Sequence, residues 1–498
     1  FGSTRWIPLS HTHCKMAINV KIEQIDVSAT IEEATSLLET ETGISPAFRS
    51  VFKLLIVLVK ILADRNTLNS RNSSKPPSSD PNREKKKKAN GKKKPGGQTG
   101  HIGKTLCRVD DPDEVEELKI DRRRLPKGKY KDVGYEARQV FDVIVSRNVT
   151  EYRAQILEDQ DGNRFVAPFP KEVTRPVQYG TNTKVNAVYM SQYQLIPYER
   201  IKDHFESQMD TPLSVGSIYN FNKSAYERLE GFEQWLKQEL IASALNHADE
   251  TGINIAGKRH WLHCVSNSSL TYLYPHNLRG TAAMNAGGVI PLFKGILCHD
   301  HWKPYYSYFC IHCLCNAHHL RELERAFEQD NQEWARKMQN LLIQINKAVD
   351  QAGGKLSPEE SKKFRKSYRK IIKEGEHECP APIRPEGKKK RGRLKRSKAR
   401  NLLERLKKFE DDVLLFMDNE LVPFTNNQGE RDLRMTKVHQ KIAGCFRSPE
   451  GSKFFCRIRS YISTCKKQGV SANEALTLLF LGKYPDFVTT NMNDYTCH

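Results

Sequence analysis

Three short strand patterns in close succession constrain the fold of this chain more than any other feature of its sequence. Residues 245–255, 258–265 and 270–274 are each rich in apolar, β-branched or aromatic side chains, and turn residues separate them. Such a succession predicts an antiparallel meander. Asp249 lies on the first of these strands. A single aspartate on a strand is usually solvated or caps a turn, so this residue indicates chemistry only if a second acid joins it.

A second acid follows another apolar run, at residues 295–302, which reaches Asp300. The two aspartates are 51 residues apart (300 − 249). If the two strands are neighbours in one sheet, the carboxylates converge on a divalent cation. Hard oxygen ligands of this kind suit Mg²⁺ or Mn²⁺.

The third acid is Glu430, within residues 423–434. Asn426 or Asn427 is expected to cap a helix, with Glu430 in its first turns and Leu433 on its inner face. The run 454–465 predicts a helix packed beside Glu430, and 472–481 predicts a last helix.

Three motifs in order carry a family resemblance: His-Ala-Asp-Glu-Thr-Gly at 247–252, His-Asp-His-Trp-Lys-Pro-Tyr at 299–305, and Asn-Asn-Gln-Gly-Glu-Arg-Asp-Leu-Arg at 426–434. Together they resemble the insertion-sequence-66 family of bacterial DDE transposases, over about Leu68 to Leu481. The resemblance implies an α/β fold with a ribonuclease-H-like catalytic domain, a mixed sheet with flanking helices and a helical insertion. It also implies that Asp249, Asp300 and Glu430 are the catalytic triad and the ligands of two Mg²⁺ (or Mn²⁺) ions.

The charge of the chain indicates a polyanionic partner. Lys and Arg number 80 against 59 Asp and Glu, a formal net charge of +21, and nucleic acid is the commonest such partner. Seven lysines within ten residues form a basic arm suited to phosphate contact, although a solvated charge run is the alternative. The residues expected to contact DNA are Lys85, Lys86, Lys87, Lys88, Lys92, Lys93, Lys94, Lys388, Lys389, Lys390, Arg391, Arg393, Arg431 and Arg434.

The sequence divides into six expected regions. Residues 16–70 are a helical or coiled-coil region, 71–105 a basic linker without packed structure, and 106–176 a small β-rich subdomain. Residues 177–244 are a helical DNA-binding region, 245–460 the catalytic domain with a helical insertion at about 324–420, and 461–485 a C-terminal helical region. Met16 is expected to be the natural start. A helix-turn-helix around 210–220 is one reading of the fourth region, and a plain helical bundle is the other.

An apolar stripe marks the first region, at Val51, Leu54, Leu58, Ile61 and Leu68, with Arg65 interrupting it. Its 3–4 spacing is that of an amphipathic helix or a short coiled-coil seam. The stripe favours either self-association, expected here as a homo-oligomer on DNA, or packing on the helix's own domain.

The cysteines do not predict a zinc site. Members of the family carry cysteine pairs in a small zinc-binding module, but no cysteine lies between Cys107 and Cys264 here. Residues 310–319 hold three cysteines and three histidines, yet their spacing is irregular and runs into a helical pattern. The Cys315-x₂-His318 pair is similar to a recurrent family motif after the second aspartate. No zinc is predicted, and the scattered thiols indicate a reducing cytosol.

No apolar run reaches the roughly 20 residues that span a bilayer, since the longest is 54–59. The expectation is a cytoplasmic, nucleoid-associated bacterial protein without a membrane partner. Its expected partners are double-stranded DNA, as element ends and target, and accessory proteins of the same element. The predicted reaction is strand cleavage followed by strand transfer. The alternatives are a metal-dependent nuclease of the same fold and a DNA-binding remnant that has lost catalysis.

Overall fold

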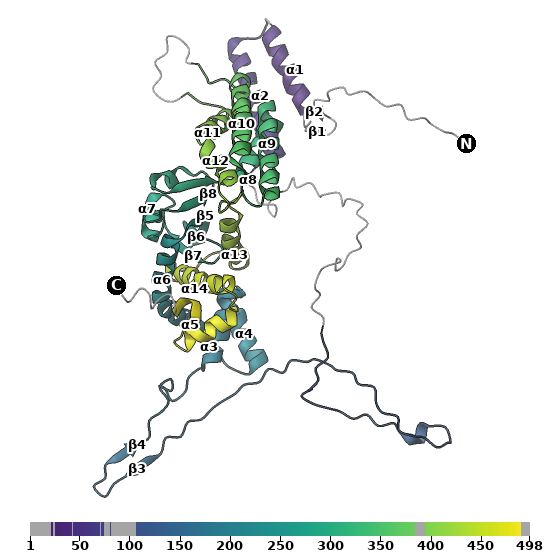
Figure 1. The fold of residues 1–498 in the computed structure, drawn as a ribbon, viewed down its shortest axis with the longest axis vertical. Coiled ribbons are helices and arrows are strands. Elements are labelled where there is room, and N and C mark those ends of the chain that lie inside the picture. The colour runs from purple at the N-terminus through teal and green to yellow at the C-terminus, as the bar shows by residue number, and fades with distance from the viewer. Residues whose placement is uncertain are drawn as a thin grey trace.

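A computed structural model describes residues 21–22, 25–41, 43–69, 71–73, 80, 106–383 and 394–489. A five-stranded sheet occupies the middle of the molecule, between a helical layer built largely from the chain after the sheet and another built from segments before and after it (Figure 1). The lysines predicted to contact DNA at 85–94, and the basic run 388–393, lie outside the described residues.

The sheet has the strand order β7-β6-β5-β8-β9. Strands β5 (Leu245–Ile255), β6 (Lys258–Ser266) and β7 (Thr271–His276) pair antiparallel, whereas β8 (Ile296–His299) and β9 (Ile311–Leu314) run parallel to β5. The predicted meander and the strand before Asp300 are therefore confirmed, and the sheet is mixed.

The β5–β6 turn explains the tight pairing at that end of the meander. Its two central residues, Ala256 and Gly257, have φ values of 48° and 80°. Positive φ at both positions is the type I′ geometry that matches the twist of two antiparallel strands. Glycine adopts it without a steric cost, and alanine adopts it at a cost.

Helices before the sheet form one layer, as the helical pattern of residues 177–244 predicted. They are α3 (Thr181–Val188), α4 (Tyr198–Met209), α5 (Val215–Arg228) and α6 (Glu230–Ala242). Ser214 caps α5 by accepting a hydrogen bond from the backbone N–H of Ser217, so the predicted turn between two helices is present. Short helix α7 (Thr281–Gly287) follows β7.

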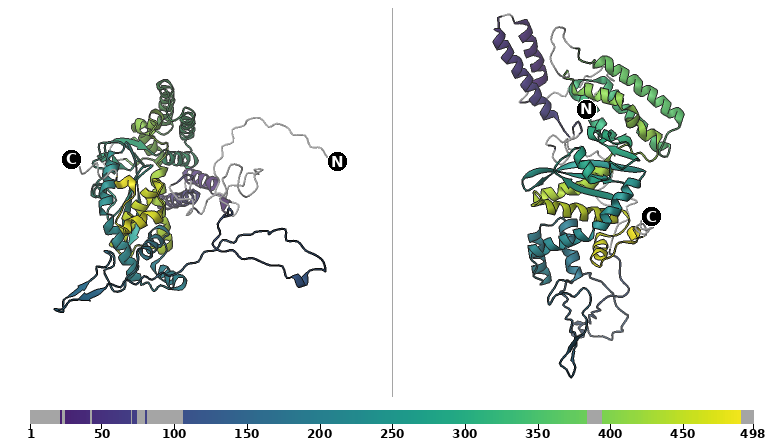
Figure 2. Two further views of the ribbon diagram at one scale, coloured as in Figure 1. Left: turned by 60° about the horizontal axis from the view of Figure 1, so that its bottom comes forward. Right: turned by 90° about the vertical axis from the view of Figure 1, so that its left-hand side faces the viewer.

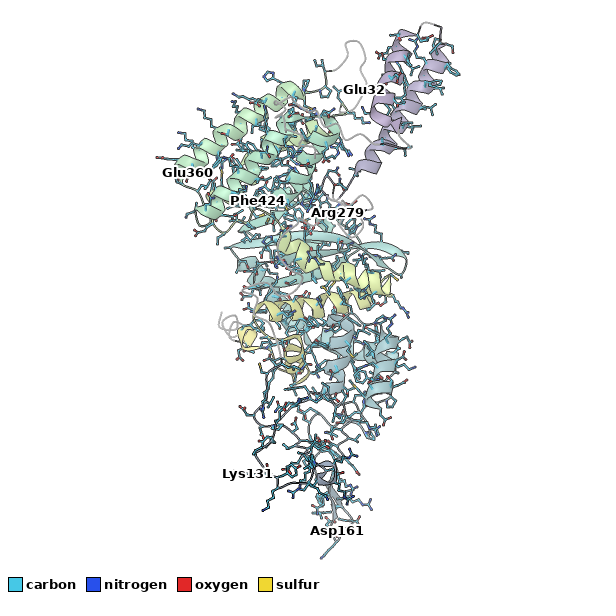
Figure 3. The ribbon with its side chains drawn as sticks, turned by 90° about the vertical axis from the view of Figure 1, so that its right-hand side faces the viewer. Glu32, Lys131, Asp161, Arg279, Glu360 and Phe424 are labelled. Carbon is cyan, nitrogen blue, oxygen red and sulfur yellow. The ribbon has the colours of Figure 1, made fainter. Side chains whose placement is uncertain are left out.

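The predicted insertion is helical and begins eight residues earlier than expected (324 − 316). It comprises α8 (Asn316–Asp330), α9 (Glu333–Gln351), α10 (Pro358–Glu378), α11 (Lys398–Lys408) and α12 (Glu410–Asp418). Their buried side chains form one cluster that includes Cys298 of β8 and Cys313 of β9. In Figure 3, Phe424 lies where this helical layer meets the sheet.

The last helices complete the other layer. They are α13 (Asn427–Ala443), α14 (Pro449–Lys467) and α15 (Ala472–Phe480), as the sequence predicted. Leu433 of α13 is buried against the β5–β6 hairpin. Two backbone N–H groups on the outer edge of β7, at Thr271 and Leu273, donate to the hydroxyls of Thr464 and Ser460 on α14. Helix α14 therefore covers an edge strand that would otherwise be open to pairing.

The amino-terminal described part is a helical hairpin of α1 (Val27–Thr40) and α2 (Pro46–Thr67), preceded by the short strands β1 (Lys21–Ile22) and β2 (Ile25–Asp26). Figure 2 shows this hairpin standing beside the helical insertion. Many of its large apolar side chains are exposed, among them Leu54 and Leu58.

Residues 106–176 are less regular than predicted. Their strands are β3 (Ile156–Glu158) and β4 (Arg164–Val166), which form one hairpin, and a short 3₁₀ helix spans Arg122–Arg124. Residues 138–145, a run rich in β-branched side chains within the predicted β-rich subdomain, form no strand: Val140 and Ile144 are 93% and 92% exposed. Such a composition predicts a strand only where a partner surface buries one face, and the described residues provide none there.

Candidate active site at the ends of β5 and β8

The pairing register of β5 and β8 brings the two predicted aspartates to one level of the sheet. Leu245 pairs with Ile296 and His247 with Cys298, so partners differ by 51 residues throughout (296 − 245, 298 − 247). Asp249 and Asp300 have the same separation, and Asp300 directly follows the end of β8. Since side chains alternate between the two faces of a strand, both aspartates lie on one face.

Glu430 reaches the same place because the start of α13 is fastened to β5. Asn426 precedes the helix, and its Nδ2 donates to the carbonyl oxygen of Ala248 at 2.9 Å. Its Oδ1 lies 2.7 Å from Nδ1 of His247. The sequence correctly placed Asn426 at the helix start, but this side chain holds the sheet and makes no capping hydrogen bond to the helix.

Gly429 allows a close approach between helix and strand. A Cβ built on Gly429 would lie 3.3 Å from the Cβ of Asp249 and 3.3 Å from Oδ1 of Asn426. These distances are tighter than ordinary van der Waals contact, so a larger residue would push α13 away. Glu430 follows immediately, and its charge is one of those that act on Asp249. Sequence reasoning missed this glycine, whose only local signal was a poor helix former in a first helical turn.

The electrostatics indicate that the acids lie near enough to act on one another. Burial raises the pKa of Asp249 well above its usual value, and the negative charges of Glu250, Asp300 and Glu430 raise it further. Opposing these effects, the backbone N–H of Glu250 donates to Oδ1 of Asp249 at 2.8 Å. Like charges held together in this way are stabilised by a bound cation.

Glu250 is a buried acid that sequence reasoning missed. Its side chain is 1% exposed and lies on the face of β5 opposite Asp249. Tyr305 donates its hydroxyl to Glu250 at 2.6 Å, and Arg279 donates from Nε and Nη2 at 2.8 and 2.6 Å. Burial is the main cause that raises the pKa of Glu250, and the charge of Asp300 adds to it.

Arg279 in turn is stacked between two indole rings, at 4.8 Å from the centroid of Trp261 and 4.1 Å from that of Trp302. Figure 3 places it at the level of the sheet. Trp302 donates its backbone N–H to Oδ1 of Asp300 at 3.1 Å. The stack and the Glu250 contacts therefore fix the loop that carries Asp300. The sequence offered one signal for this arrangement: Glu250 lies in the first acidic motif and Tyr305 in the second.

Histidines beside the acids pack within the fold. His299 Nε2 lies 3.0 Å from His312 Nδ1, and His301 Nδ1 lies 2.8 Å from the hydroxyl of Tyr306. Burial lowers the pKa of His301 to about 3 and that of His299 well below its usual value. Both rings are therefore uncharged at neutral pH and shape the loop around Asp300.

Of the cysteines and histidines at 310–319, the structure brings Cys315 and His318 to Glu430. One ligand atom from each of the three residues lies within 4.8 Å of the others. The remaining members have other neighbours: Cys313 Sγ is 3.7 Å from Cys298 Sγ, and His319 Nδ1 is 3.1 Å from Oδ1 of Asn316.

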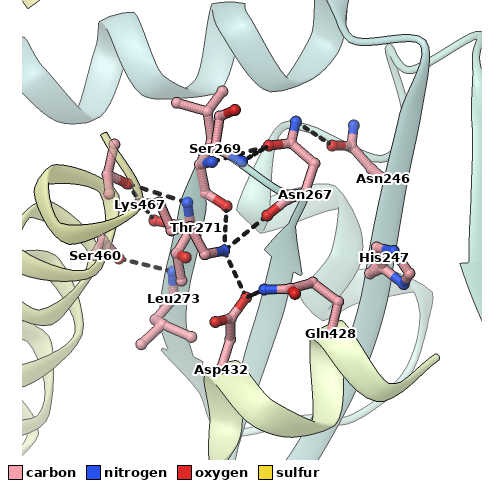
Figure 4. Close-up of polar contacts among 12 residues, drawn as sticks. Asn246, His247, Asn267, Ser269, Thr271, Leu273, Gln428, Asp432, Ser460 and Lys467 are labelled. Carbon is pink, nitrogen blue, oxygen red and sulfur yellow. Dashed lines mark hydrogen bonds and ion pairs between the residues drawn. The ribbon is translucent and has the colours of Figure 1, made fainter. Parts of the chain in front are cut away.

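A buried ion pair sets the position of α13 on its other side (Figure 4). Lys467 of α14 donates to Oδ2 of Asp432 at 2.8 Å and to the carbonyl oxygens of Asn267 and Leu270 at 2.8 and 2.9 Å. Gln428 adds a 3.0 Å hydrogen bond to the same carboxylate. These contacts tie the helix that carries Glu430 to α14 and to the β6–β7 turn.

Of the predicted DNA contacts, Arg431 and Arg434 are described, and both are exposed on α13. Arg431 also lines an open cleft of about 920 Å³, together with His247, Asn427 and Gln428. The three acids are not among the residues that line this cleft. Farther along α13, Lys437 donates to the carbonyl oxygen of Gly252 at 3.1 Å. Positive side chains are therefore spread along α13.

Among the described helices, none is both long enough and apolar enough to cross a bilayer. A search of curated proteins found no match to the chain. Residues 16–106 match a family of unknown function, DUF6444. Residues 176–454 match the family described as "Transposase IS66 family", which is 279 of the 498 residues (454 − 176 + 1). With more than half of its length matched, including all three acidic motifs, the chain belongs to the IS66 family of transposases.

Proposed function

We propose that this transposase cuts DNA at the ends of its element in a divalent-metal-dependent reaction and joins the resulting 3′-hydroxyl to target DNA. One observation carries the proposal. Three acids distant in sequence, Asp249, Asp300 and Glu430, meet on one face of the sheet through the β5–β8 register and the close approach of α13 at Gly429.

The donor set fits Mg²⁺ or Mn²⁺. The three carboxylates offer hard oxygen ligands, and their mutual repulsion at Asp249 is what a cation would relieve. Asp249, Asp300 and Glu430 would together hold the two ions. Bound there, the ions would activate the attacking oxygen and stabilise the leaving one in an in-line phosphoryl transfer.

The chain's own part in this reaction is positioning. Asn426 and the Asp432–Lys467 pair hold α13, and with it Glu430, against β5. Glu250 and Arg279 hold the loop of Asp300 from the opposite face. Fixed ligands spare the reaction the cost of ordering them during catalysis.

DNA would be held mainly by its phosphates. Arg431 and Arg434 project from the helix that carries Glu430, so a phosphate near the acids would meet positive charge. The lysine runs 85–94 and 388–393 would add contacts that do not depend on DNA sequence. The partners proposed are double-stranded element ends and target, a second copy of the chain, and accessory proteins of the element.

A cleavage and joining experiment tests this function. A labelled element-end duplex is incubated with Mg²⁺ and with the wild type, Asp249→Ala, Asp300→Ala or Glu430→Ala. Each variant should lose at least about a thousandfold in rate, because metal ligands act as a unit, while its DNA affinity is largely kept. Asp350→Ala, at an exposed carboxylate of α9, is the matched control and should react normally.

The products separate the competing functions. Joined products that disappear in the three variants would support a transposase. Normal cleavage by Asp300→Ala would refute the assignment of the acids. Cutting that never leads to joining would favour a nuclease of the same fold, and tight binding without any chemistry would indicate a remnant that has lost catalysis.

A further inference from the structure

The cluster of Cys315, His318 and Glu430 combines a thiol, an imidazole and a carboxylate at a point where three elements meet. Cys315 precedes α8, His318 lies in its first turn, and Glu430 lies in the first turn of α13. One candidate ligand atom from each falls within 4.8 Å of the other two. Sequence spacing alone gave no zinc site here, because Glu430 lies 112 residues after His318 (430 − 318).

The backbone holds Cys315 in place independently of its side chain. The N–H of Cys315 donates to the carbonyl oxygen of His299 at 3.0 Å, next to Asp300. The neighbouring N–H of Asn316 donates to the carbonyl oxygen of Phe424 at 3.0 Å, just before α13. The start of α8 is therefore held between the end of β8, which precedes Asp300, and the segment that precedes α13. A site built on such anchors is preorganised.

Hydrogen bonds within the protein leave metal-ligand atoms of the cluster available. Nδ1 of His318 is buried, and no described residue is within hydrogen-bond reach of it. Nε2 of His318 lies 4.0 Å from Oε1 of Glu430, beyond hydrogen-bond distance. Sγ of Cys315 meets the backbone N–H of Asn426 at 3.1 Å, a contact that favours negative charge on sulfur.

We propose that Cys315, His318 and Glu430 form a binding site for a thiophilic divalent cation of the Zn²⁺ class, distinct in chemistry from the Mg²⁺ centre but sharing Glu430 with it. Sulfur and imidazole nitrogen are ligands that Zn²⁺ accepts and Mg²⁺ avoids. A water would complete four-coordination, as in zinc sites with three protein ligands.

The distances are compatible with this assignment. Zinc bonds of about 2.0–2.3 Å separate neighbouring ligand atoms of a tetrahedral site by about 3.5 Å. The ligand atoms of the cluster lie within 4.8 Å of one another, so they would have to approach by no more than about 1.3 Å on binding, which side-chain rotation can supply. Binding would release the thiol proton of Cys315, since the thiolate is the ligand.

Sharing of Glu430 has a consequence that rests on the proposed function. A carboxylate bound to Zn²⁺ at Cys315 and His318 is withdrawn from the Mg²⁺ centre. Zn²⁺ would then inhibit strand cleavage reversibly, and excess Mg²⁺ would compete poorly because it has little affinity for the thiolate.

Absorption of Co²⁺ tests the site without any catalytic readout. Co²⁺ occupies Zn²⁺ sites and gives a thiolate-to-metal charge-transfer band, so the full-length protein is titrated with Co²⁺ in the absence of DNA and Mg²⁺. The band should appear with the wild type and be displaced by Zn²⁺. Affinity should fall at least about tenfold in Cys315→Ser and in His318→Gln, since even outer-shell changes cost that much.

Substitutions of two other cysteines test whether the charge-transfer band arises at Cys315. Cys310→Ser, at a half-buried thiol nearby, and Cys313→Ser, at the thiol facing Cys298, should leave it unchanged. Circular dichroism of each variant reports folding. A band that is absent from the folded wild type, or that follows Cys313 and survives Cys315→Ser, would overturn the site.

A substitution of Glu430 tests whether this residue belongs to the zinc site. Glu430→Gln should weaken Co²⁺ binding, and an unchanged affinity would overturn the sharing of Glu430 while leaving the cysteine–histidine pair. In cleavage assays, the ratio of rates with and without Zn²⁺ should rise in Cys315→Ser. A wild type that binds Co²⁺ as expected but cuts no DNA with Mg²⁺ would contradict the proposed function and not this site. Co²⁺ binding is measured without DNA or Mg²⁺.

Discussion

Asp249 is held in the fold at an energetic cost. Burial, and then the charges of Glu250, Asp300 and Glu430, raise the pKa of this carboxyl well above the ordinary value, which is about 3.9 in an unfolded chain. Between these two pKa values the folded protein keeps a proton that the unfolded chain has released. The free energy of unfolding therefore falls as pH rises through this interval, and the full loss is present above the raised pKa.

Asp249→Asn should consequently stabilise the protein when divalent cations are absent. Each unit by which the pKa is raised corresponds to about 1.4 kcal/mol, so the gain over wild type should be larger at about pH 8 than at about pH 5. Urea unfolding in a chelating buffer measures it. Mg²⁺ should stabilise the wild type and not the variant. A variant that is less stable than wild type at the higher pH would show that the charge cluster is not costly.

The burial of Glu250 could not be predicted from the sequence. An acid next to a candidate ligand is normally exposed, since unpaired carboxylates are rarely buried. Here the side chain is buried because Arg279 and Tyr305, 29 and 55 residues later (279 − 250, 305 − 250), both turn toward it. Neither partner can be identified from local spacing.

At the scale of elements, α13 is held by an ion pair that the local pattern does not predict. Asp432 and Lys467 have side chains only 9% and 14% exposed. Lys467→Met would leave the Asp432 charge buried with Gln428 as its remaining described partner. Breaking a buried pair in this way costs about 3–5 kcal/mol.

Urea unfolding of Lys467→Met against Lys453→Met, at an exposed lysine of the same helix, measures that cost. The control should change stability by less than about 0.5 kcal/mol. Equal stability of the two variants would contradict a structural role for the pair. Adding Asp432→Asn to Lys467→Met should recover part of the loss, because the unpaired charge is then gone.

The elements themselves were largely predictable where their signals are local. β5, β6 and β7 follow from alternation and a two-residue turn, and the helices of the insertion from apolar periodicity. The pairing of β5 with β8 was guessed from two strands that each carry an acid, and the shared offset of 51 residues supports it. The β-structure predicted at 138–145 was wrong because a β-rich composition does not reveal whether a partner surface exists.

The apolar face of α2 belongs to this scale too. Leu54 and Leu58 are 60% and 47% exposed in the hairpin with α1, which favours self-association over packing on the same domain. Burying each leucine would contribute about 1.5–3 kcal/mol. Leu54→Lys with Leu58→Lys should therefore raise the dimer dissociation constant at least about a hundredfold.

Sedimentation velocity over a range of concentrations measures this association. Lys60→Ala, a substitution of a charged residue on the same helix, is the matched control and should associate as the wild type does. A wild type that stays monomeric at every concentration would contradict the assignment of this face to a second copy.

At the scale of the whole molecule, the excess of positive charge should appear in the salt dependence of DNA binding. Replacing Lys85 to Lys88 and Lys92 to Lys94 with alanine removes seven charges. If all seven contact phosphate, the slope of log affinity against log salt should fall by about 6, at about 0.9 per contact. Fluorescence anisotropy at several salt concentrations measures the slope.

A control variant removes positive charge at another place. It carries three substitutions on the exposed face of α10, Lys362→Ala, Lys366→Ala and Lys373→Ala. Their slope should stay near that of the wild type. A seven-lysine variant with an unchanged slope would show that the basic arm is solvated in the complex. Base preference should not change in either variant, because phosphate contacts carry no sequence information.

The order of the three acids along the chain determines when their cluster can form during synthesis. Asp249 and Asp300 leave the ribosome long before Glu430, which follows Asp249 by 181 residues (430 − 249). Until α14 emerges, the outer edge of β7 also lacks the hydroxyls of Ser460 and Thr464 that cover it. A chain that stops between residues 301 and 429 therefore carries the lysines at 85–94 and two of the three acids, and under the proposed function it would bind DNA without cutting it.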